Sequence, residues 1–410
     1  MSNWEWKKLG DVAEIARGGS PRPIKEFITT DKDGVNWIKI GDTDPTGKYI
    51  FETEEKIKPS GIKKSRYVEK GDFLLSNSMS FGRPYILMTD GCIHDGWLVL
   101  RKYQDYLDID FFYHLLTSPF VQNQFDREAR GSTVRNLNTD IVSKIEVPIP
   151  PLLEQKRIVK TLDEKFAKID KLKSAAETNL KNAKEIFNAE LEKSLNPLAC
   201  HSERSASEVE ESRNDLPKGW ERKSLGYVCE ITSALVDPKE KKYLNLYHVG
   251  GANIESETGK LIDLKTAEEE GLTSGKFVFD ETMVLYNKIR PYLKKIARPK
   301  FSGLCSADMY PLSPKENIVK DFLYYVLTTK IFTDYAILNS GRAGMPKVNR
   351  ESLFAYEFSL PPLSEQTRIV AHLDKLSEKV KRLEENYTRT IADCEELKKS
   401  ILKQTFEGQS

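Results

Sequence analysis

Residues 150–159 read Pro-Pro-Leu-Leu-Glu-Gln-Lys-Arg-Ile-Val, and residues 361–370 repeat them as Pro-Pro-Leu-Ser-Glu-Gln-Thr-Arg-Ile-Val. A pair of prolines favours an extended entry and is then compatible with the first turn of a helix. Each stretch therefore predicts the start of a helix. Because self-similarity along a chain is the signature of a repeated architecture, the match also indicates that the whole chain is built from two copies of one unit.

Other parts of the sequence repeat in the same order and at a nearly constant offset. Residues 4–15 read Trp-Glu-Trp-Lys-Lys-Leu-Gly-Asp-Val-Ala-Glu-Ile and return at 220–231 as Trp-Glu-Arg-Lys-Ser-Leu-Gly-Tyr-Val-Cys-Glu-Ile. The pattern Asp-Phe-x-Tyr-x-x-Leu-Thr occurs at 110–117 and again at 321–328. Asn77 followed by Arg83-Pro84-Tyr85 also resembles Asn287 followed by Arg290-Pro291-Tyr292. Together these matches predict an internal duplication.

Each copy opens with a segment of mixed periodicity. Short β-rich runs, such as 35–40, 97–100 and 282–286, are separated by Gly, Pro, Asn and Asp, and an amphipathic helix is expected at 109–116 and at 320–327. This pattern predicts a compact domain with a mostly antiparallel sheet. The expected fold class is α+β, with two globular α/β domains that alternate with two long helices.

Each copy closes with a long helix. From Ile158 and from Ile369 the apolar residues recur in steps of three and four among Lys and Glu, which is the pattern of a coiled-coil seam. About 44 residues at roughly 1.5 Å per residue give a helix about 66 Å long. Since the first helix must lead into the second globular domain, an antiparallel pair would place one globular domain at each end of a rod. The predicted seam residues are Ile158, Leu162, Ile169, Leu180, Phe187, Ile369, Leu373, Val380, Leu383 and Ile391.

The duplication divides the chain into five segments. Residues 1–150 and 217–361 are the expected globular domains, and residues 151–197 and 362–408 are the expected helical repeats. Residues 198–216 are rich in Ser and Glu and poor in apolar side chains, which is typical of a flexible linker.

Composition excludes several classes of protein. The 410 residues are 39% hydrophobic and 30% charged, which argues against a disordered chain, and no apolar run is long enough for a membrane span. The five cysteines are scattered and form no Cys-x-x-Cys pair, which argues against a disulfide framework and a thiolate zinc site. The first residues lack the apolar core of a signal peptide, so a reducing cytoplasm is the expected location.

Positive charge is clustered locally, although the formal net charge is only +1. Residues 58–70 carry five positive side chains against one negative, and residues 286–300 carry six against none. Such clusters, interspersed with Tyr, Asn and Ser, can neutralise phosphates and read base edges. The predicted DNA-binding residues are Lys63, Lys64, Arg66, Asn77, Arg83 and Tyr85 in the first copy, and Asn287, Lys288, Arg290, Tyr292, Lys294 and Lys295 in the second.

Two Gly-rich segments supply a second set of candidates. Glycine lets the backbone approach phosphate closely, and the flanking side chains reach further. The predicted contacts are Arg130, Ser132, Thr133 and Arg135 in the first copy, with the neighbouring Asn136, and Arg342, Lys347 and Arg350 in the second, with Asn349. The alternative interpretation is a tight turn before the last strand of each domain.

Each of these features also has a purely structural interpretation. A lone basic cluster is as compatible with a solvated surface as with DNA contact, and recurrence in both copies favours contact. His94-Asp95 resembles a general-base pair, but the corresponding region of the second copy has Ser306 and Ala307. A structural histidine is therefore the preferred interpretation of His94, and His114, on the predicted helix, is expected to pack.

The repeated motifs resemble those of the specificity (S) subunits of type I restriction-modification enzymes, and the resemblance covers the whole chain. In that family two target-recognition domains alternate with two helical repeats. The repeats open with Pro-Leu-x-Glu-Gln-x-x-Ile, as residues 151–158 and 362–369 do. The domain openings at Trp4 and Trp220, and the Gly-rich segments at Gly131 and Gly341, are equally typical.

The resemblance implies a DNA-recognition subunit rather than a catalyst. It implies binding of a bipartite double-stranded DNA target, with one half-site for each globular domain, and docking of two methyltransferase (M) subunits together with restriction (R) subunits. The coiled coil would fix the distance between the half-sites. S-adenosylmethionine, ATP and Mg²⁺ would bind the partner subunits, and this chain would hold no metal and no small-molecule substrate.

Catalytic signatures are weak in the sequence. Asn196-Pro197-Leu198 lacks the second proline and the aromatic ring of an adenine-methyltransferase motif, and no Gly-x-Gly turn follows a strand. Asp237-Pro238-Lys239-Glu240-Lys241 has the elements of a nuclease motif in reversed order. Two other functions stay open: a coiled-coil scaffold that binds proteins but no DNA, and a fused restriction or methylation enzyme.

Overall fold

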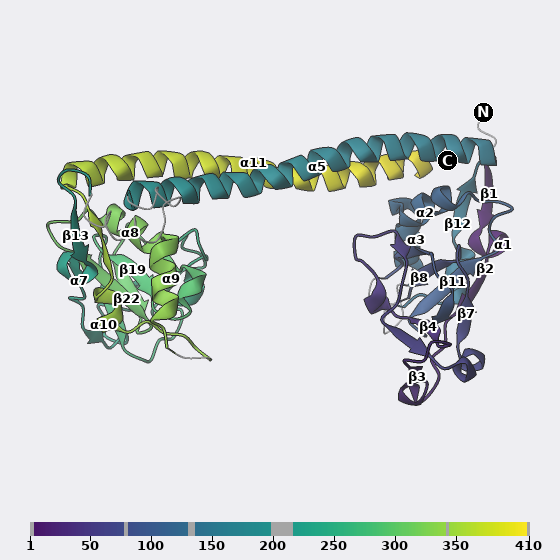
Figure 1. Ribbon diagram of the computed structural model, residues 1–410, viewed down its shortest axis with the longest axis horizontal. Helices are drawn as coiled ribbons and strands as arrows, with labels where there is room; N and C mark the ends of the chain where they lie inside the picture. Colours follow the sequence, from purple (N-terminus) through teal and green to yellow (C-terminus); the bar gives the residue numbers. More distant parts are fainter. Residues whose placement is uncertain (1–3, 78–80, 130–135, 198–215, 342–343, 408–410) are drawn as a thin grey trace. The chain divides into compact units, whose positions relative to one another are not determined.

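The computed structural model describes residues 4–77, 81–129, 136–197, 216–341 and 344–407. The chain forms two compact units. The first unit comprises Met1–Glu177 and Thr388–Ser410, and the second comprises Thr178–Tyr387. Each unit combines one sheet-rich globular domain with parts of both long helices (Figure 1).

The first globular domain follows the expected α+β pattern. Its elements are β1 (Glu5–Lys8), α1 (Leu9–Val12), β2 (Glu14–Arg17), η1 (Ile24–Glu26), β3 (Ile28–Thr29), β4 (Val35–Ile38), η2 (Ile40–Asp42), β5 (Tyr49–Ile50), β6 (Glu55–Ile57), η3 (Pro59–Lys64), β7 (Arg66–Val68), β8 (Phe73–Ser76), β9 (Pro84–Leu87), β10 (Gly91–Ile93), β11 (Trp97–Arg101), α2 (Ile109–Thr117), α3 (Pro119–Glu128), α4 (Thr139–Lys144) and β12 (Glu146–Ile149).

The second globular domain has the same order of elements with local differences. They are β13 (Glu221–Ser224), α7 (Leu225–Val228), β14 (Cys229–Glu230), β15 (Leu235–Val236), β16 (Tyr247–Val249), η6 (Gly251–Asn253), β17 (Lys265–Thr266), β18 (Lys276–Phe279), β19 (Val284–Asn287), η7 (Pro291–Leu293), β20 (Ile296–Ala297), β21 (Gly303–Ser306), β22 (Met309–Pro314), α8 (Lys320–Thr328), α9 (Lys330–Leu338), α10 (Arg350–Phe354) and β23 (Glu357–Leu360).

The sheets of the two domains share most of their strand order and differ at their edges, where β3 and β15 lie at opposite ends of one sheet and β5 has no counterpart in another. One sheet has the order β3-β6-β4-β10-β7 in the first domain and β17-β16-β21-β18-β15 in the second, with β4 parallel to β10 and β16 parallel to β21. A second sheet has the order β2-β11-β8-β9-β5 in the first domain and β14-β22-β19-β20 in the second. A third, two-stranded sheet pairs β1 with β12 and β13 with β23, antiparallel in both cases. The internal repeat is thus a repeat of topology, and the mostly antiparallel sheet is confirmed.

Local sequence explains how the helices of the first domain begin. The carboxylate of Asp108 accepts hydrogen bonds from the backbone amides of Asp110 and Phe111, so Asp108 caps α2. Ser118 caps α3 in the same way, and a proline occupies the first position of that helix. The apolar faces of these helices pack on the core that includes Phe73 and Leu98 of the sheet. The first unit thereby gains a rigid base on which exposed loops can be held.

The two long helices, α5 (Leu152–Leu195) and α11 (Leu363–Glu407), lie side by side in each unit (Figure 1). In the first unit Lys173 pairs with Glu395 and Asp170 with Lys398. In the second unit His372 Nε2 lies 3.0 Å from the Glu190 carboxylate. Residues of α5 with lower numbers pair with residues of α11 with higher numbers. The two helices are therefore antiparallel, as expected for the coiled coil.

Most predicted seam residues are shielded from solvent. Ile158, Leu162, Ile169, Ile369, Leu373 and Val380 are buried, Leu180, Phe187 and Ile391 are partly buried, and Leu383 is exposed. Seam positions not in the predicted set are also buried, including Ala176, Ala183 and Cys394.

A buried glutamine joins each globular domain to its helix. Gln155 accepts a hydrogen bond from the Asp108 amide (2.8 Å) and donates to the carbonyls of Tyr106 (2.7 Å) and Pro150 (2.8 Å). Gln366 makes the corresponding three bonds in the second unit, to Val319, Asn317 and Pro361. Both glutamines are fully buried. Because a buried amide without partners is costly, these bonds explain why Gln occurs at this position in both copies of the motif.

Candidate nucleic-acid interface

One group of basic side chains of the first domain gathers around the end of η3 and the ends of two strands. Lys63 and Lys64 end η3 and Arg66 begins β7, and all three are exposed. The Arg66 Nε donates to the carbonyl of Arg17 at 3.3 Å, which places the end of β2 beside this cluster. Arg17 is also exposed and was missed by the sequence analysis, because it lies far from residues 58–70 along the chain.

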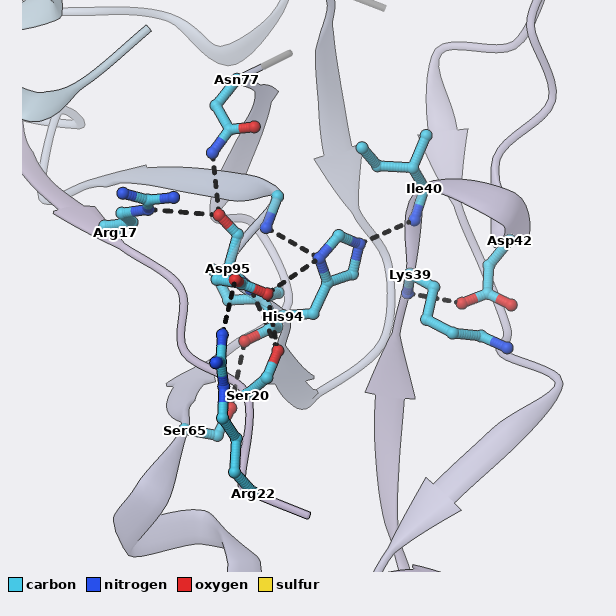
Figure 2. A network of polar contacts seen from close by, with 12 residues as sticks. Arg17, Ser20, Arg22, Lys39, Ile40, Asp42, Ser65, Asn77, His94 and Asp95 are labelled. Atoms are coloured by element: carbon cyan, nitrogen blue, oxygen red, sulfur yellow. Dashed lines mark hydrogen bonds and ion pairs between the residues drawn. The ribbon is translucent and has the colours of Figure 1, made fainter. Parts of the chain in front are cut away.

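A polar network anchors this cluster to the connection between β10 and β11 (Figure 2). The carbonyl of Asp95 accepts from Asn77 Nδ2 at 2.8 Å and from Arg17 Nε at 3.2 Å. The Asp95 carboxylate accepts from the Ser20 hydroxyl at 2.7 Å and lies 3.8 Å from the Arg22 guanidinium. The hydrogen bond from Ser20 lowers the pKa of Asp95, so this carboxylate stays charged.

Glycine is required where β2 leaves this network. A Cβ atom on Gly18 would lie 2.1 Å from the carbonyl oxygen of His94, so no other residue fits there. The close approach brings the turn that carries Ser20 and Arg22 against Asp95. We call Arg17, Arg22, Lys63, Lys64 and Arg66 the first basic surface.

His94 has the geometry of a structural residue. The backbone amide of Ile40 lies 3.2 Å from its Nε2 and that of Gly96 lies 2.7 Å from its Nδ1, so both ring nitrogens face the backbone. Burial lowers the pKa of His94, which favours a neutral ring. His114 packs on Phe166 and lies 3.1 Å from the Asp163 carboxylate, in line with a packing role.

In the second domain one cluster of positive charge lies on the connection between β19 and β20. Arg290 and Lys294 flank η7 and have φ angles of 52° and 47°, a left-handed conformation that is costly for residues with long side chains. The Arg290 amide donates to the Pro346 carbonyl at 2.8 Å, which ties the turn to the segment after the Gly-rich residues. Tyr292, between the two, is 51% exposed. The turn therefore holds an aromatic ring and two cations in a fixed arrangement.

Two lysines of this region point inward. Lys288 Nζ donates to the Ala307 carbonyl at 2.5 Å and lies 4.8 Å from the ring centre of Tyr310. Burial lowers the pKa of Lys288, and the nearby charge of Lys347 lowers it further. Lys295 Nζ donates to the Gly251 carbonyl at 2.5 Å. The second basic surface consists of four exposed residues, Arg290, Tyr292, Lys347 and Arg350, and the partly exposed Lys294.

The structure corrects one part of the internal alignment. Asn77 and Lys288 occupy the same position, because the side chain of each donates to a carbonyl after the parallel strand, that of Asp95 or of Ala307. The main-chain carbonyl of Asn77 accepts from Leu137 and that of Lys288 accepts from Val348. The proposed match of Asn77 with Asn287 is thus wrong by one residue.

The match of Arg83-Pro84-Tyr85 with Arg290-Pro291-Tyr292 is also wrong. The main-chain carbonyl of Arg83 accepts a hydrogen bond from the last residue of β8, and the main-chain carbonyl of Lys295 accepts one from the last residue of β19. Arg83 therefore corresponds to Lys295. Pro84 begins the strand β9, whereas Pro291 begins the η7 turn that precedes β20. Tyr85 consequently lies in the core with 1% exposure, while Tyr292 is on the surface.

The other predicted contacts fall into two groups. Asn77 and Asn287 are buried, and Arg83 is partly buried with its guanidinium 3.4 Å from the Gly47 carbonyl. Arg130, Ser132, Thr133, Arg135 and Arg342 lie outside the described residues.

In the described ranges, no group of three or more His, Cys, Asp or Glu side chains is placed to hold a metal ion. No helix among the described residues is both long and apolar enough to cross a membrane. Cys92, Cys229, Cys305 and Cys394 are buried free thiols, and burial raises the pKa of Cys229 and of Cys305 to about 12.

Comparison with known proteins agrees with this organisation. The family model described as "Type I restriction modification DNA specificity domain" matches residues 1–182 and again residues 217–391. The EcoDI specificity subunit of Escherichia coli is 32% identical over 317 residues, which are 73% of this chain and 70% of that protein. The StySPI specificity subunit of Salmonella potsdam is 21% identical, over 99% of this chain and 89% of its own length.

Solved structures share the fold. A chain from a study of complex assembly and conformational transition of the type I restriction-modification system superimposes with a TM-score of 0.75 at 20% identity, covering 98% of this chain and 97% of that one. The HsdS subunit from Thermoanaerobacter tengcongensis superimposes with a TM-score of 0.59 at 21% identity, covering 99% and 97%. Since the family model matches both halves of the duplication, the chain belongs to the family of type I restriction-modification DNA specificity subunits.

Proposed function

We propose that each globular domain reads one half of a two-part DNA target through its basic surface. One observation carries the proposal: two domains that share most of their topology carry their clusters of positive charge on different elements, η3, β7 and the end of β2 in one and the η7 turn with Lys347 and Arg350 in the other. A shared frame with different exposed side chains is what two readers of different sequences require.

The side chains would divide the work of binding. Lysines and arginines at the rim, such as Lys63, Lys64, Lys294 and Lys347, would neutralise phosphates. Arg66 and Arg290 can pair with guanine in the major groove, and the exposed ring of Tyr292 can contact a base edge or a thymine methyl group. Five other predicted residues would support these side chains from inside the domains, since each is buried or bound to a main-chain carbonyl. They are Asn77, Tyr85, Asn287, Lys288 and Lys295.

The antiparallel helices would set the spacing of the two half-sites. Helices of 44 and 45 residues at about 1.5 Å per residue are about 66 Å long, close to two turns of duplex at about 34 Å each. The boundaries predicted at 150, 197, 216 and 361 would then separate readers from spacer.

The chain would act without catalysis of its own. We propose that two methyltransferase subunits and restriction subunits dock on it, and that they supply the sites for S-adenosylmethionine, ATP and Mg²⁺. The proposed location is the cytoplasm, where the chromosome of a bacterial or archaeal cell lies.

A selection experiment tests the proposal. The chain purified with its methyltransferase partner is mixed with a library of random duplexes, and the bound fraction is sequenced at several salt concentrations. The expected result is one motif of two short parts separated by a fixed unread spacer, with affinity that falls as salt rises. Binding without sequence preference would refute specific recognition, and an absence of DNA binding at low salt would favour the protein scaffold instead.

A further inference from the structure

Three exposed apolar side chains of the second domain lie on segments that meet beside the second basic surface. Tyr292 is 51% exposed, Met345 is 56% exposed and Leu338 is 83% exposed. A single exposed apolar side chain is common on a protein surface and marks no site, whereas several that meet among polar groups mark a contact surface. We call these three residues the apolar patch.

A main-chain hydrogen bond joins the first two segments of the apolar patch. The amide of Arg290 donates to the carbonyl of Pro346 at 2.8 Å. These residues lie two positions before Tyr292 and one position after Met345. An antiparallel bridge between the same two segments reinforces the contact. The turn that carries Tyr292 and the segment that carries Met345 are thus held side by side.

The end of α9 is the third segment of the apolar patch. The amide of Lys347 donates to the carbonyl of Ser340, two residues after Leu338, at 3.1 Å, and α9 also packs against η7. The face of α9 that carries Phe332 and Ala336 is buried, which leaves Leu338 in contact with solvent. The patch is therefore assembled by tertiary structure from parts of the chain that are distant in sequence.

The backbone on both sides of Tyr292 is held in an unfavourable conformation. Arg290 and Lys294 flank η7 with left-handed φ angles of 52° and 47°, although neither residue is a glycine. Strain of this kind persists where the surrounding structure maintains it, and it is concentrated at functional positions. Here the strained turn presents the Tyr292 ring to solvent.

Positive charge surrounds the apolar patch. Four cations of the second basic surface lie on the same segments or directly after them; they are Arg290, Lys294, Lys347 and Arg350. One exposed carboxylate, that of Glu351, accompanies them, so the rim of the patch carries a net positive charge. A surface with this charge attracts a polyanion such as DNA.

Base edges in the major groove offer few apolar groups to such a patch. Each base pair presents hydrogen-bond donors and acceptors there, and thymine alone adds a methyl group. Contact between this methyl group and an exposed apolar side chain removes apolar surface from water on both partners. The first basic surface consists of lysines and arginines alone, so this kind of contact distinguishes the second surface from the first.

We propose that the apolar patch contacts thymine methyl groups in the half-site of the second domain. Leu338 and Met345 then determine sequence specificity together with Tyr292. The inference rests on the proposed function, in which this domain reads one half of a DNA target. The surrounding cations would contact the phosphates and fix the orientation of the domain, and the patch would lie against the base edges.

Deoxyuridine, which is thymidine without the C5 methyl group, is the probe that tests the proposal. The chain in complex with its methyltransferase is titrated with duplexes that carry the two-part motif obtained by selection. Each thymine of the second domain's half-site is replaced in turn, after Arg290→Ala has shown which half-site this is. At one or more positions the affinity should fall about fourfold, the value for one buried methyl group.

Variants of the apolar patch should remove this sensitivity. Met345→Ala, Leu338→Ala and Tyr292→Ala each reduce the apolar surface available to a methyl group. At least one of them should bind the thymine and deoxyuridine duplexes equally at the sensitive position, which is the coupling that a double-mutant cycle measures. Because all three side chains are exposed, thermal unfolding of the variants should be unchanged.

Ile331, at the other end of α9, supplies a matched control. It is 42% exposed, but its neighbour Lys330 is paired with Asp334, and the Lys330 amide bonds to Glu192 of α5. Ile331→Ala should therefore keep the fourfold preference for thymine. Deoxyuridine in the half-site of the first domain supplies a second control, since Met345→Ala should not alter its effect.

The outcomes separate this inference from the proposed function. A second half-site without thymine, or one in which no deoxyuridine lowers the affinity, would overturn the inference while two-part recognition stands. A preference for thymine that all three variants retain would overturn it too, and if those variants also bind both duplexes more weakly, the patch inserts between base pairs instead. Binding without any sequence preference would contradict the proposed function itself.

Discussion

The two globular domains share a frame and differ at its edges. Four strands of one sheet follow the same order in both, but the fifth strand is β3, beside β6, in the first domain and β15, beside β18, in the second. The buried Gln155 and Gln366 make the same three hydrogen bonds in their units, whereas the clusters of exposed cations lie on different elements. The comparison teaches that the two copies share their interior while their exposed basic surfaces differ.

The largest expected effect tests the shared frame. Gln155→Ala and Gln366→Ala each remove three buried hydrogen bonds, so each should cost about 3 kcal/mol of unfolding free energy. Hydrogen exchange followed by mass spectrometry should localise the loss to the first unit for one variant and to the second for the other. Lys156→Ala, at the exposed neighbour, is the control, and a clearly smaller loss for one glutamine would break the equivalence.

The next effect tests the difference between the reading surfaces. Tyr292→Ala should reduce the binding free energy by which the second domain discriminates its own half-site from altered ones, by about 1–3 kcal/mol. Recognition of the other half-site should stay unchanged. Arg66→Ala should do the reverse. Competition binding with duplexes altered in one half at a time measures both, and damage to both halves by one substitution would contradict independent readers.

A smaller effect concerns the contact between each domain and its helix. The Asp374 carboxylate accepts hydrogen bonds from Arg298 at 2.7 Å and from Tyr325 at 2.6 Å. The Asp163 carboxylate lies 3.1 Å from His114 Nε2. Because both carboxylates are partly exposed, Asp374→Ala should cost about 1 kcal/mol and Asp163→Ala about half of that. Chemical denaturation of each variant checks the order, and equal losses would show that the extra arginine contributes nothing.

The smallest effect is a dependence on pH. Burial lowers the pKa of His114 below its ordinary value, although its hydrogen bond to Asp163 acts in the opposite direction. A histidine that is harder to protonate when folded stabilises the protein fully above its unfolded pKa of about 6.5, and this contribution is lost as pH falls below that value. His114→Tyr, which introduces the residue found at 325, should flatten the fall in stability of the first unit below about pH 6.5. An unchanged pH profile for His114→Tyr would refute the assignment.

The sequence predicts the parts of this molecule that depend on periodicity. The duplication, the α+β domains and the antiparallel long helices follow from repeated motifs and from apolar residues at helical spacing, and the structure confirms them. The motif Glu-Gln could be recognised, but the reason for it could not, because the partners of Gln155 are main-chain groups of a loop distant in sequence.

The candidate surfaces were predicted only in part. Arg17 and Arg22 were missed because the sheet, rather than the sequence, brings them to Arg66 and Asp95. Tyr85 and Tyr292 follow the same Arg-Pro pair, yet one lies in a strand and the other in a turn, so one side chain is in the core and the other is exposed. Local patterns cannot distinguish these cases, since burial is decided by strand pairing.

Mapping of methylated sites tests the central claim most directly. The chain and its partners are expressed in cells that lack other methylation systems, and modified bases are located across the genome by single-molecule sequencing. We predict one motif of two parts around a fixed unread spacer, with a methyl mark in each part, and a change in only one part when Arg290 and Tyr292 are replaced by alanine. A continuous motif, or a change in both parts, would contradict the account of two independent readers on one chain.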